Sequence, residues 1–337
     1  MKIAIVGFGF SAEKSHLPAY KNRSDIDVKA VVDPVTSRRA AALRQYPNIR
    51  VYEEFGDLLE EYSHEIDIID VCLPSTFHLE SVKQALGADK HVLCEKPLVL
   101  NKGEYDELVN IANERKRILY PCHNYKFAPS IVHATELINS GQIGKPLFAS
   151  FNIFGANFQS ELSQWKAELP KNQELSNGGI MIDHGLDAIS VAQTLFGGCP
   201  QHISAHIRNL NKTNSQLEDL AIFCLDWEQK LINITVSSLG SIPKAYYIIQ
   251  GTEGEISIDN NDIFLSVKNE PVKKIFVPTH FDEPGHGSWF NGLIDNLLDC
   301  IKTENTKPFS LIEAGIILDI IEKANHSSRN GGAWMRI

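Results

Sequence analysis

The chain has 337 residues, with 42 acidic and 32 basic side chains and a formal net charge of -10. This length favours two domains with separate cores, and the negative charge repels phosphate backbones, so we expect no nucleic-acid partner. Six cysteines lie far apart without a Cys-x-x-Cys pair, which predicts neither a zinc site nor a disulfide framework.

Short apolar stretches alternate with amphipathic ones through the first third of the chain. The apolar stretches are KIAIV (2–6), VKAVV (28–32), IDIIDVCL (66–73), HVLCE (91–95) and ILYPC (118–122). This alternation is typical of βαβ units on a parallel sheet. Gly87 follows an amphipathic stretch, and we expect it to end a helix in the left-handed conformation.

The first stretch follows Met1 without a signal-peptide pattern, and no apolar run approaches the roughly 20 residues that span a bilayer. We therefore expect a cytoplasmic protein without membrane contact. The pattern changes after Cys122, where one helical stretch is followed by strands of antiparallel character and two closing helical stretches at 288–302 and 311–328. Runs of strands with segregated helices predict an α+β second domain with a mostly antiparallel sheet.

The turn GFGFSA, residues 7–12, follows the first strand and opens a helix. Gly7 permits a tight turn, Gly9 lets backbone amides approach a pyrophosphate, and Ala12 allows close packing of helix on strand. Phe8 and Phe10 complete the turn. The pattern predicts a dinucleotide-binding turn.

Asp33 ends the second strand, about 20 residues farther along, where an acid accepts hydrogen bonds from the adenosine ribose. This favours NAD as the cofactor. Arg38 and Arg39 follow closely and could neutralise a 2′-phosphate, so NADP is possible.

Further motifs follow in a fixed order. They are LPSTFH (73–78), CEKPL (94–98), HNYKFAP (123–129), QWK (164–166) and GGIMIDHGLDAI (178–189). Together with the glycine turn, this set resembles the glucose-fructose oxidoreductase and inositol dehydrogenase (Gfo/Idh/MocA) family. The motifs are spread over the first 190 residues, and the remainder is similar only in its strand pattern and last helix.

The resemblance implies a Rossmann NAD(P)-binding domain over residues 1–121 and a substrate-binding α/β domain over residues 122–337. In such proteins the second domain has an open-faced sheet that is often used for oligomerisation, so we expect a homodimer or homotetramer. The resemblance also implies hydride transfer between nicotinamide and a carbinol of a sugar or cyclitol. A small sugar-like molecule is then the substrate, and no metal is expected.

The cofactor-binding positions come from the turn and from the resemblance. They are Gly7, Phe8, Gly9, Phe10, Ala12, Asp33, Arg38, Leu73, Pro74, Ser75, Thr76, His78, Glu95, Lys96, Asn124 and Trp165. Trp165 and Lys166 resemble a Trp-Arg element of the family, but lysine lacks the bidentate fork of arginine. His16 matches a family position near the cofactor and could equally be a packed core histidine.

Lys96 corresponds to the catalytic lysine of the family. A cation near the reacting oxygen stabilises developing alkoxide charge, and it can transfer a proton if burial lowers its pKa. Pro97 removes a backbone donor and fixes the turn that aims Lys96.

The family usually has a histidine four residues after the aspartate at position 183, as its general base. Asp187 stands there in this chain, and a histidine stands at 184 instead. On a regular helix, Asp183 and Asp187 would face the same cleft. Three interpretations remain: Asp187 is a base of raised pKa, His184 supplies the imidazole and is oriented by Asp187, or the site binds a dinucleotide without catalysis.

A subgroup of the family, the aldose 1-dehydrogenases, carries Asn rather than His at the later position. Oxidation of a hemiacetal hydroxyl makes a smaller demand on the base, so an aldose or related sugar is the substrate that we expect. Asp183 could also cap a helix after Gly178 and Gly179. The rival hypothesis is a dinucleotide-sensing regulator on the same scaffold.

Overall fold

The computed structural model describes residues 1–21, 23–155, 179–211, 217–278 and 284–337. They form two compact units. The first contains Met1–His123 and residues 284–315, and the second contains the described residues from 124 to 278 and from 316 to the end. None of the helices in the described ranges combines the length and apolar character that crossing a bilayer needs.

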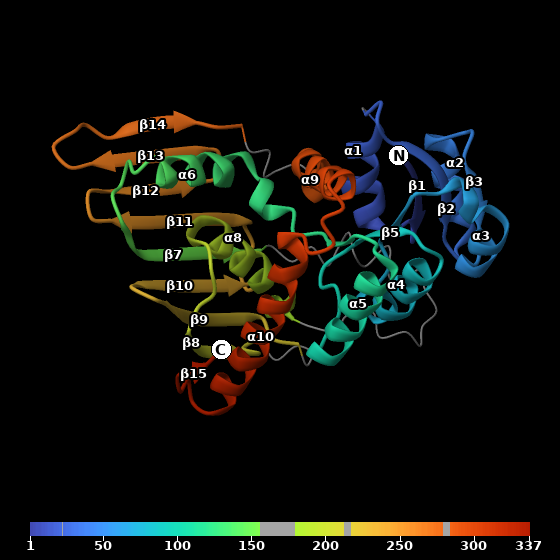
Figure 1. The fold of residues 1–337 in the computed structure, drawn as a ribbon. Helices are drawn as coiled ribbons and strands as arrows, with labels where there is room; N and C mark the ends of the chain where they lie inside the picture. The colour runs from blue at the N-terminus through green and yellow to red at the C-terminus, as the bar shows by residue number, and fades with distance from the viewer. Residues whose placement is uncertain (22, 156–178, 212–216, 279–283) are drawn as a thin grey trace. The chain divides into compact units, whose positions relative to one another are not determined.

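A parallel sheet forms the centre of the first unit (Figure 1). Its strands are β1 (Lys2–Val6), β2 (Asp27–Val32), β3 (Arg50–Tyr52), β4 (Ile68–Val71), β5 (His91–Cys94) and β6 (Leu119–Pro121), in the order β3-β2-β1-β4-β5-β6. All neighbouring pairs are parallel. The strand β4 is buried along its whole length, as expected where helices cover both faces of a parallel sheet.

Helices connect these strands, as the sequence pattern predicts. They are η1 (Ala12–His16), α1 (Leu17–Lys21), α2 (Thr36–Gln45), α3 (Phe55–Tyr62), η2 (Ser63–Glu65), η3 (Ser75–Phe77), α4 (His78–Gly87) and α5 (Lys102–Arg115). The side chain of Asn101 caps α5 by accepting a hydrogen bond from the backbone N–H of Glu104 at 3.0 Å. The unit also includes η6 (Pro284–Trp289) and α9 (Phe290–Lys302).

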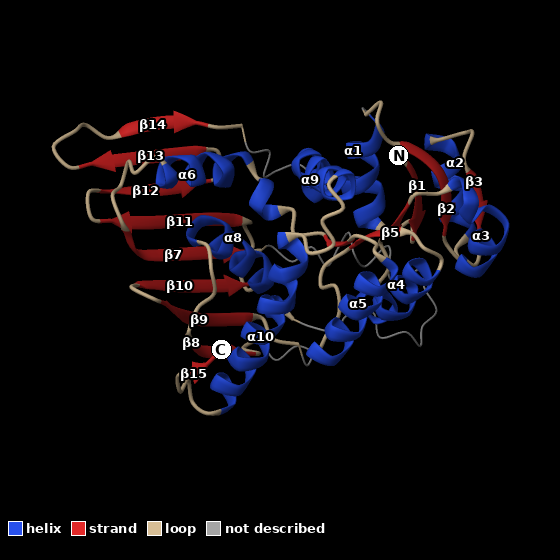
Figure 2. Cartoon of the chain, viewed as in Figure 1, coloured by secondary structure: helices blue, strands red, loops and turns tan. Residues whose placement is uncertain are grey.

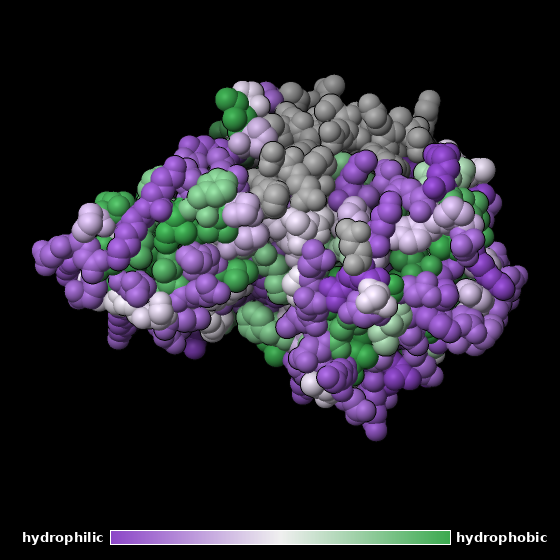
Figure 3. All heavy atoms as spheres, turned by 90° about the horizontal axis from the view of Figure 1, so that it is seen from above, coloured by the Kyte–Doolittle hydropathy of each residue, from purple (hydrophilic) through white to green (hydrophobic). Residues whose placement is uncertain are grey.

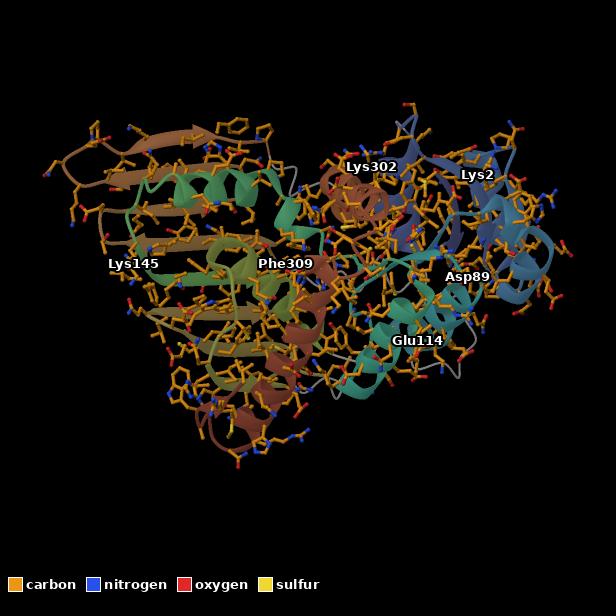
Figure 4. All side chains as sticks on the ribbon, in the orientation of Figure 1. Lys2, Asp89, Glu114, Lys145, Lys302 and Phe309 are labelled. Atoms are coloured by element: carbon orange, nitrogen blue, oxygen red, sulfur yellow. The ribbon has the colours of Figure 1, made fainter. Side chains whose placement is uncertain are left out.

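The left-handed residue expected at Gly87 is instead Asp89, labelled in Figure 4, with φ of 57°. The N–H of Lys90 donates to the carbonyl of Ala85, and the N–H of Asp89 donates to that of Leu86. This is a Schellman motif, which begins two residues later than expected. Aspartate tolerates the left-handed conformation better than most residues, so the motif does not need glycine.

A mixed, mostly antiparallel sheet dominates the second unit (Figure 2). Its strands are β7 (Pro146–Phe154), β8 (His202–Arg208), β9 (Leu220–Trp227), β10 (Lys230–Ser237), β11 (Lys244–Gly251), β12 (Gly254–Asp259), β13 (Asp262–Val267), β14 (Lys273–Phe276) and β15 (Met335–Arg336). Their order is β14-β13-β12-β11-β7-β10-β9-β8-β15. The pair β7–β10 is parallel, and the other described pairs are antiparallel.

One face of this sheet packs against helices. In Figure 1, α6 (Pro129–Asn139) and α8 (Leu186–Phe196) lie over it. The long helix α10 (Phe309–Arg329) begins among residues of the first unit and continues into the second. Its residues Ser327 and Ser328 accept hydrogen bonds from backbone N–H groups of β8 at 2.9 and 2.8 Å.

The other face of the sheet is more open. Along β7, Ala149, Phe151 and Ile153 are buried, while the residues between them are partly exposed. Ile222 lies between two buried residues of β9, Leu231 precedes the buried Ile232 of β10, and both are about two-fifths exposed, at 40% and 43%. Hydrophobic and hydrophilic residues share the surface seen in Figure 3. The predicted fold class, a Rossmann domain followed by a domain with an open-faced sheet, is confirmed.

Candidate dinucleotide and catalytic residues

The glycine turn has the close approach that its sequence predicts. Gly7 has φ of 91°, and its N–H donates to the carbonyl of Val32 at 2.8 Å. A Cβ at Gly7 would lie 2.9 Å from the backbone oxygen of Cys72, whereas a Cβ at Gly9 would meet no atom within 4 Å. Gly7 therefore joins two strands tightly, and Gly9 leaves open space beside the backbone for a dinucleotide. The helix expected after the turn begins with a π-helical turn, η1.

Asp33 ties the end of β2 to this turn. Its carboxylate accepts hydrogen bonds from the N–H groups of Phe8 and Val35, both at 2.8 Å, and it lies 3.7 Å from a guanidinium nitrogen of Arg38. The Asp33 side chain is buried, at 2% exposure, so in this structure it serves first to fix the glycine turn. The guanidinium of Arg39 donates to the backbone oxygens of Asp33 and Pro34 and to Glu53. The chain itself therefore occupies the donors of Arg39 that could bind a 2′-phosphate.

Glu95 and Lys96 stand directly after β5, at the same edge of the sheet as the glycine turn. The N–H of Glu95 donates to the carbonyl of Val71 at 2.9 Å, and the Glu95 carboxylate accepts a hydrogen bond from the N–H of Lys96 at 2.9 Å. Burial favours the neutral acid, but the hydrogen bond from His16 and the charges of His16 and Lys96 prevail and lower the pKa of Glu95. Lys96 is half-buried, and the bond between it and Pro97 is cis.

The loop after β4 carries the predicted cofactor contacts of the LPSTFH motif. Leu73, Pro74 and Ser75 are partly exposed, and Thr76 is exposed. His78 is buried, and its ring nitrogens lie 2.8 Å from the carbonyl oxygen of Pro97 and 2.7 Å from that of Leu73. His78 therefore links this loop to the loop of Lys96.

Sequence reasoning left the role of His16 open, and the structure gives it specific partners. Its side chain is fully buried, with Nδ1 2.8 Å from a carboxylate oxygen of Asp70 and Nε2 2.9 Å from one of Glu95. Asp70 was missed because it lies within an apolar strand. A buried acid in such a strand needs a partner, and this is the signal that could have found it.

In the second unit, the segment with Asp183, His184 and Asp187 is not one regular helix. A π-helical turn, η5 (Met181–Gly185), precedes α8, and Asp187 lies in the first turn of α8. The side chain of Asp183 is 63% exposed, and that of His184 is 12% exposed, with Nε2 3.8 Å from the Asp183 carboxylate. Asp187 is fully buried. The wider π turn changes the angle between positions 183 and 187, and the two acids differ in exposure.

Two tyrosines lie close to these acids. Burial, together with the charges of Asp187 and Asp183, raises the pKa of the Tyr125 phenol well above its usual range. Burial and the charge of Asp187 likewise raise the pKa of Tyr247. Both phenols can donate hydrogen bonds at neutral pH, as an unperturbed tyrosine also can.

His184 has an unusual environment. Among the described residues its buried Nδ1 has no hydrogen-bond partner, and a Cβ at Gly155 would lie 3.1 Å from its Nε2.

Asn124 is buried at the start of the second unit. Trp165 falls outside the described residues. Within the first unit, the glycine turn, Asp33 and the Lys96 turn share one sheet edge, and the acids with His184 form a second cluster within the second unit.

Comparison with known proteins adds independent information. Residues 1–123 match the family model GFO_IDH_MocA, which describes an oxidoreductase family with an NAD-binding Rossmann fold. Residues 135–337 match the model of the C-terminal alpha/beta domain of the same oxidoreductase family.

Relatives with described activities are similar to the chain. D-glucoside 3-dehydrogenase of Escherichia coli is 27% identical over 216 residues, which are 64% of this chain and 59% of that protein. 2,7-anhydro-N-acetylneuraminate hydratase of Mediterraneibacter gnavus is 29% identical over 311 residues, or 86% and 78% of the two chains. The structure of levoglucosan dehydrogenase with NADH and levoglucosan has a TM-score of 0.84 at 16% identity, covering 100% of this chain and 99% of that one.

Proposed function

The chain belongs to the Gfo/Idh/MocA oxidoreductase family, and from this premise we propose that it transfers hydride between NAD and a carbinol carbon of a sugar or sugar derivative. The two family models confirm the resemblance seen in the motifs, and with it the NAD-binding Rossmann domain. The names of the relatives, a glucoside dehydrogenase and an anhydro-neuraminate hydratase, support a sugar-derived substrate.

The observation that carries the proposal is the position of Lys96. It follows β5, while the glycine turn follows β1, and the strand β4 lies between these two strands. Ligands of open α/β sheets bind at the carboxyl ends of the strands. The ammonium group of Lys96 therefore belongs to the same edge of the sheet as the turn that would hold the dinucleotide.

The residues present fit NAD, because Gly9 leaves room for the pyrophosphate and Asp33 ends β2 beside the glycine turn, where an acid of this fold reads the ribose. When bound, NAD supplies the nicotinamide carbon that accepts or returns the hydride. Lys96 donates to the substrate oxygen and stabilises the negative charge that develops on it. The Arg39 guanidinium already donates hydrogen bonds to Glu53 and to backbone oxygens, so it is not available for the 2′-phosphate of NADP, which supports NAD as the cofactor.

The proton of the substrate hydroxyl goes to the second cluster. His184 and Asp187 are the two candidates for the base, and Asp183 orients the substrate. The free nitrogen of His184 among the described residues supports the imidazole as the acceptor, with Asp183 near its other nitrogen. The complete burial of Asp187 favours a supporting role below the surface, near the buried phenols of Tyr125 and Tyr247.

The test is a broad substrate screen. The chain is incubated with NAD and free aldoses, alkyl glycosides, anhydro sugars, cyclitols, sugar phosphates and nucleotide sugars, and NADH absorbance is followed. We expect NADH absorbance to increase with at least one class of substrate, and we expect no such increase with the Lys96→Met variant. NAD binding without turnover in either direction, including from NADH with keto sugars, would instead support the dinucleotide-sensing regulator.

We propose a homodimer or homotetramer as the working assembly. Its support is the open face of the second sheet, where apolar side chains such as Ile222 and Leu231 are exposed in the single chain. Light scattering on the purified protein measures the subunit number directly. A monomer at micromolar concentration would contradict this part of the proposal.

A further inference from the structure

We propose that His16 and His78 are positioning residues that hold the Lys96 turn from two sides, His16 through the Glu95 carboxylate and His78 through the carbonyl oxygen of Pro97. The inference rests on the proposed function, since it concerns how the Lys96 ammonium is aimed. All of these residues belong to the first unit.

The first support runs from the centre of the sheet to the backbone of Lys96. Asp70 lies in the buried strand β4, and one of its oxygens is 2.8 Å from Nδ1 of His16. The other ring nitrogen of His16 is 2.9 Å from Oε1 of Glu95, and Oε2 of Glu95 accepts the N–H of Lys96 at 2.9 Å. An unbroken series of hydrogen bonds therefore connects β4 with the residue that carries the ammonium group.

Charge makes this support rigid. Burial alone would lower the pKa of His16, but the Asp70 carboxylate and the neighbouring Cys72 raise it well above its usual value. The ring is therefore an imidazolium, and both N–H groups can donate to carboxylates. The hydroxyl of Tyr20 donates to the same oxygen of Asp70 at 2.7 Å, and the Cys72 sulfur lies 3.5 Å from Nδ1. Charge-assisted hydrogen bonds of this kind are stronger and shorter than neutral ones.

The second support approaches from the loop after β4. His78 opens α4, is buried, and lies 2.8 Å from the carbonyl of Pro97 and 2.7 Å from that of Leu73. A carbonyl oxygen only accepts, and burial lowers the pKa of His78, so the neutral ring lies against both oxygens and donates its single N–H to one of them at a time. The residue after Lys96 is thus tied to the loop that is expected to lie beside the cofactor.

The two supports act on different neighbours of Lys96. His16 fixes the side chain that precedes Lys96, and His78 fixes the backbone that follows it. A displacement of a catalytic group by about 1 Å can cost a hundredfold in rate, so groups that hold the turn affect turnover without touching the substrate.

The test compares His16→Gln, Glu95→Gln and His78→Gln with the matched control His64→Gln, which alters an exposed histidine of the same unit. For His16→Gln we expect kcat to fall by about 10- to 100-fold, while KM and the Kd for NAD change by less than about threefold. For His78→Gln we expect the Kd for NAD to rise as well, because the loop of Leu73 is released. The control keeps wild-type values.

A second readout needs no substrate. The Lys96 amide is held by Glu95, so its hydrogen exchange should be about tenfold faster or more in His16→Gln and unchanged in His64→Gln. Glu95→Gln keeps the side-chain shape and carries the same test if His16→Gln does not fold. Wild-type kcat and wild-type exchange in the folded variants would overturn the inference. If Lys96→Met retains full turnover, it is the proposed function that fails.

Discussion

Alanine at Gly7 should lower the stability of the fold, whereas alanine at Gly9, two positions away, should weaken NAD binding and leave the stability nearly unchanged. At Gly7, a φ of 91° and a Cβ 2.9 Å from the Cys72 oxygen and 3.0 Å from a Leu73 methyl group mean strain and overpacking. These costs together amount to about 2–5 kcal/mol. A loss of this size lowers the thermal midpoint by about 5–15 °C.

At Gly9, the added methyl group meets no atom within 4 Å, so the midpoint should change by less than about 2 °C. The methyl group would occupy the space that a pyrophosphate needs, and the Kd for NAD should rise at least tenfold, or about 1.4 kcal/mol. Calorimetric titration with NAD and thermal unfolding followed by circular dichroism measure both quantities. Wild-type NAD affinity in Gly9→Ala would refute the assignment of this turn to the dinucleotide.

The remaining predictions concern the charged groups. Lys96→Met should lower turnover by about 100-fold or more while the Kd for NAD stays within about threefold, as steady-state kinetics and titration would show; unchanged turnover would remove Lys96 from the chemistry. Asp33→Ser should weaken NAD binding by about tenfold and reduce the ratio of the Kd for NADP to the Kd for NAD. An unchanged ratio would show that Asp33 does not bind the ribose. His184→Asn and Asp187→Asn distinguish the two candidates for the base. The variant that lacks the base should lose the pH dependence of kcat, whereas the variant that lacks a supporting acid should have a lower kcat with the same pH dependence. The pKa of Glu95 in the folded protein lies below its ordinary value of 4.5, so the charged carboxylate stabilises the fold above that pH. This stabilisation is lost as the pH falls below about 4.5, and the difference in thermal midpoint between wild type and Glu95→Gln should then shrink. A difference in thermal midpoint that grows as the pH falls would contradict this prediction.

Local patterns in the sequence predict the local features of the site. The spacing of Gly7, Gly9 and Ala12 is enough to place a tight turn after β1, since only small residues permit that backbone. Asp33 was found in the same way, from its distance along the chain. The buried residues of β7 alternate with period two, as the apolar positions of LFASFNIF do, whereas the open-faced sheet was expected from the family resemblance.

Features that depend on partners far along the chain could not be predicted. The hydrogen bonds of His16 join it to Asp70 and Glu95, which are 54 and 79 residues away, and no spacing rule connects those positions. The grouping of α9 with the first unit rests on contacts of the same kind, such as the hydrogen bond from the Tyr120 hydroxyl to Asn296 at 2.7 Å. The π turn before α8 and the difference between the exposed Asp183 and the buried Asp187 also do not follow from a regular helical period.

The central proposal is that NAD binds at the glycine turn of the first unit and that the Lys96 ammonium of the same unit acts on the reacting oxygen of the substrate. A crystal structure with NAD and a product analogue from the screen tests it most directly. The account predicts Lys96 Nζ within about 3.2 Å of the reacting substrate oxygen. A reacting oxygen out of reach of Lys96, with NAD in place, would contradict it.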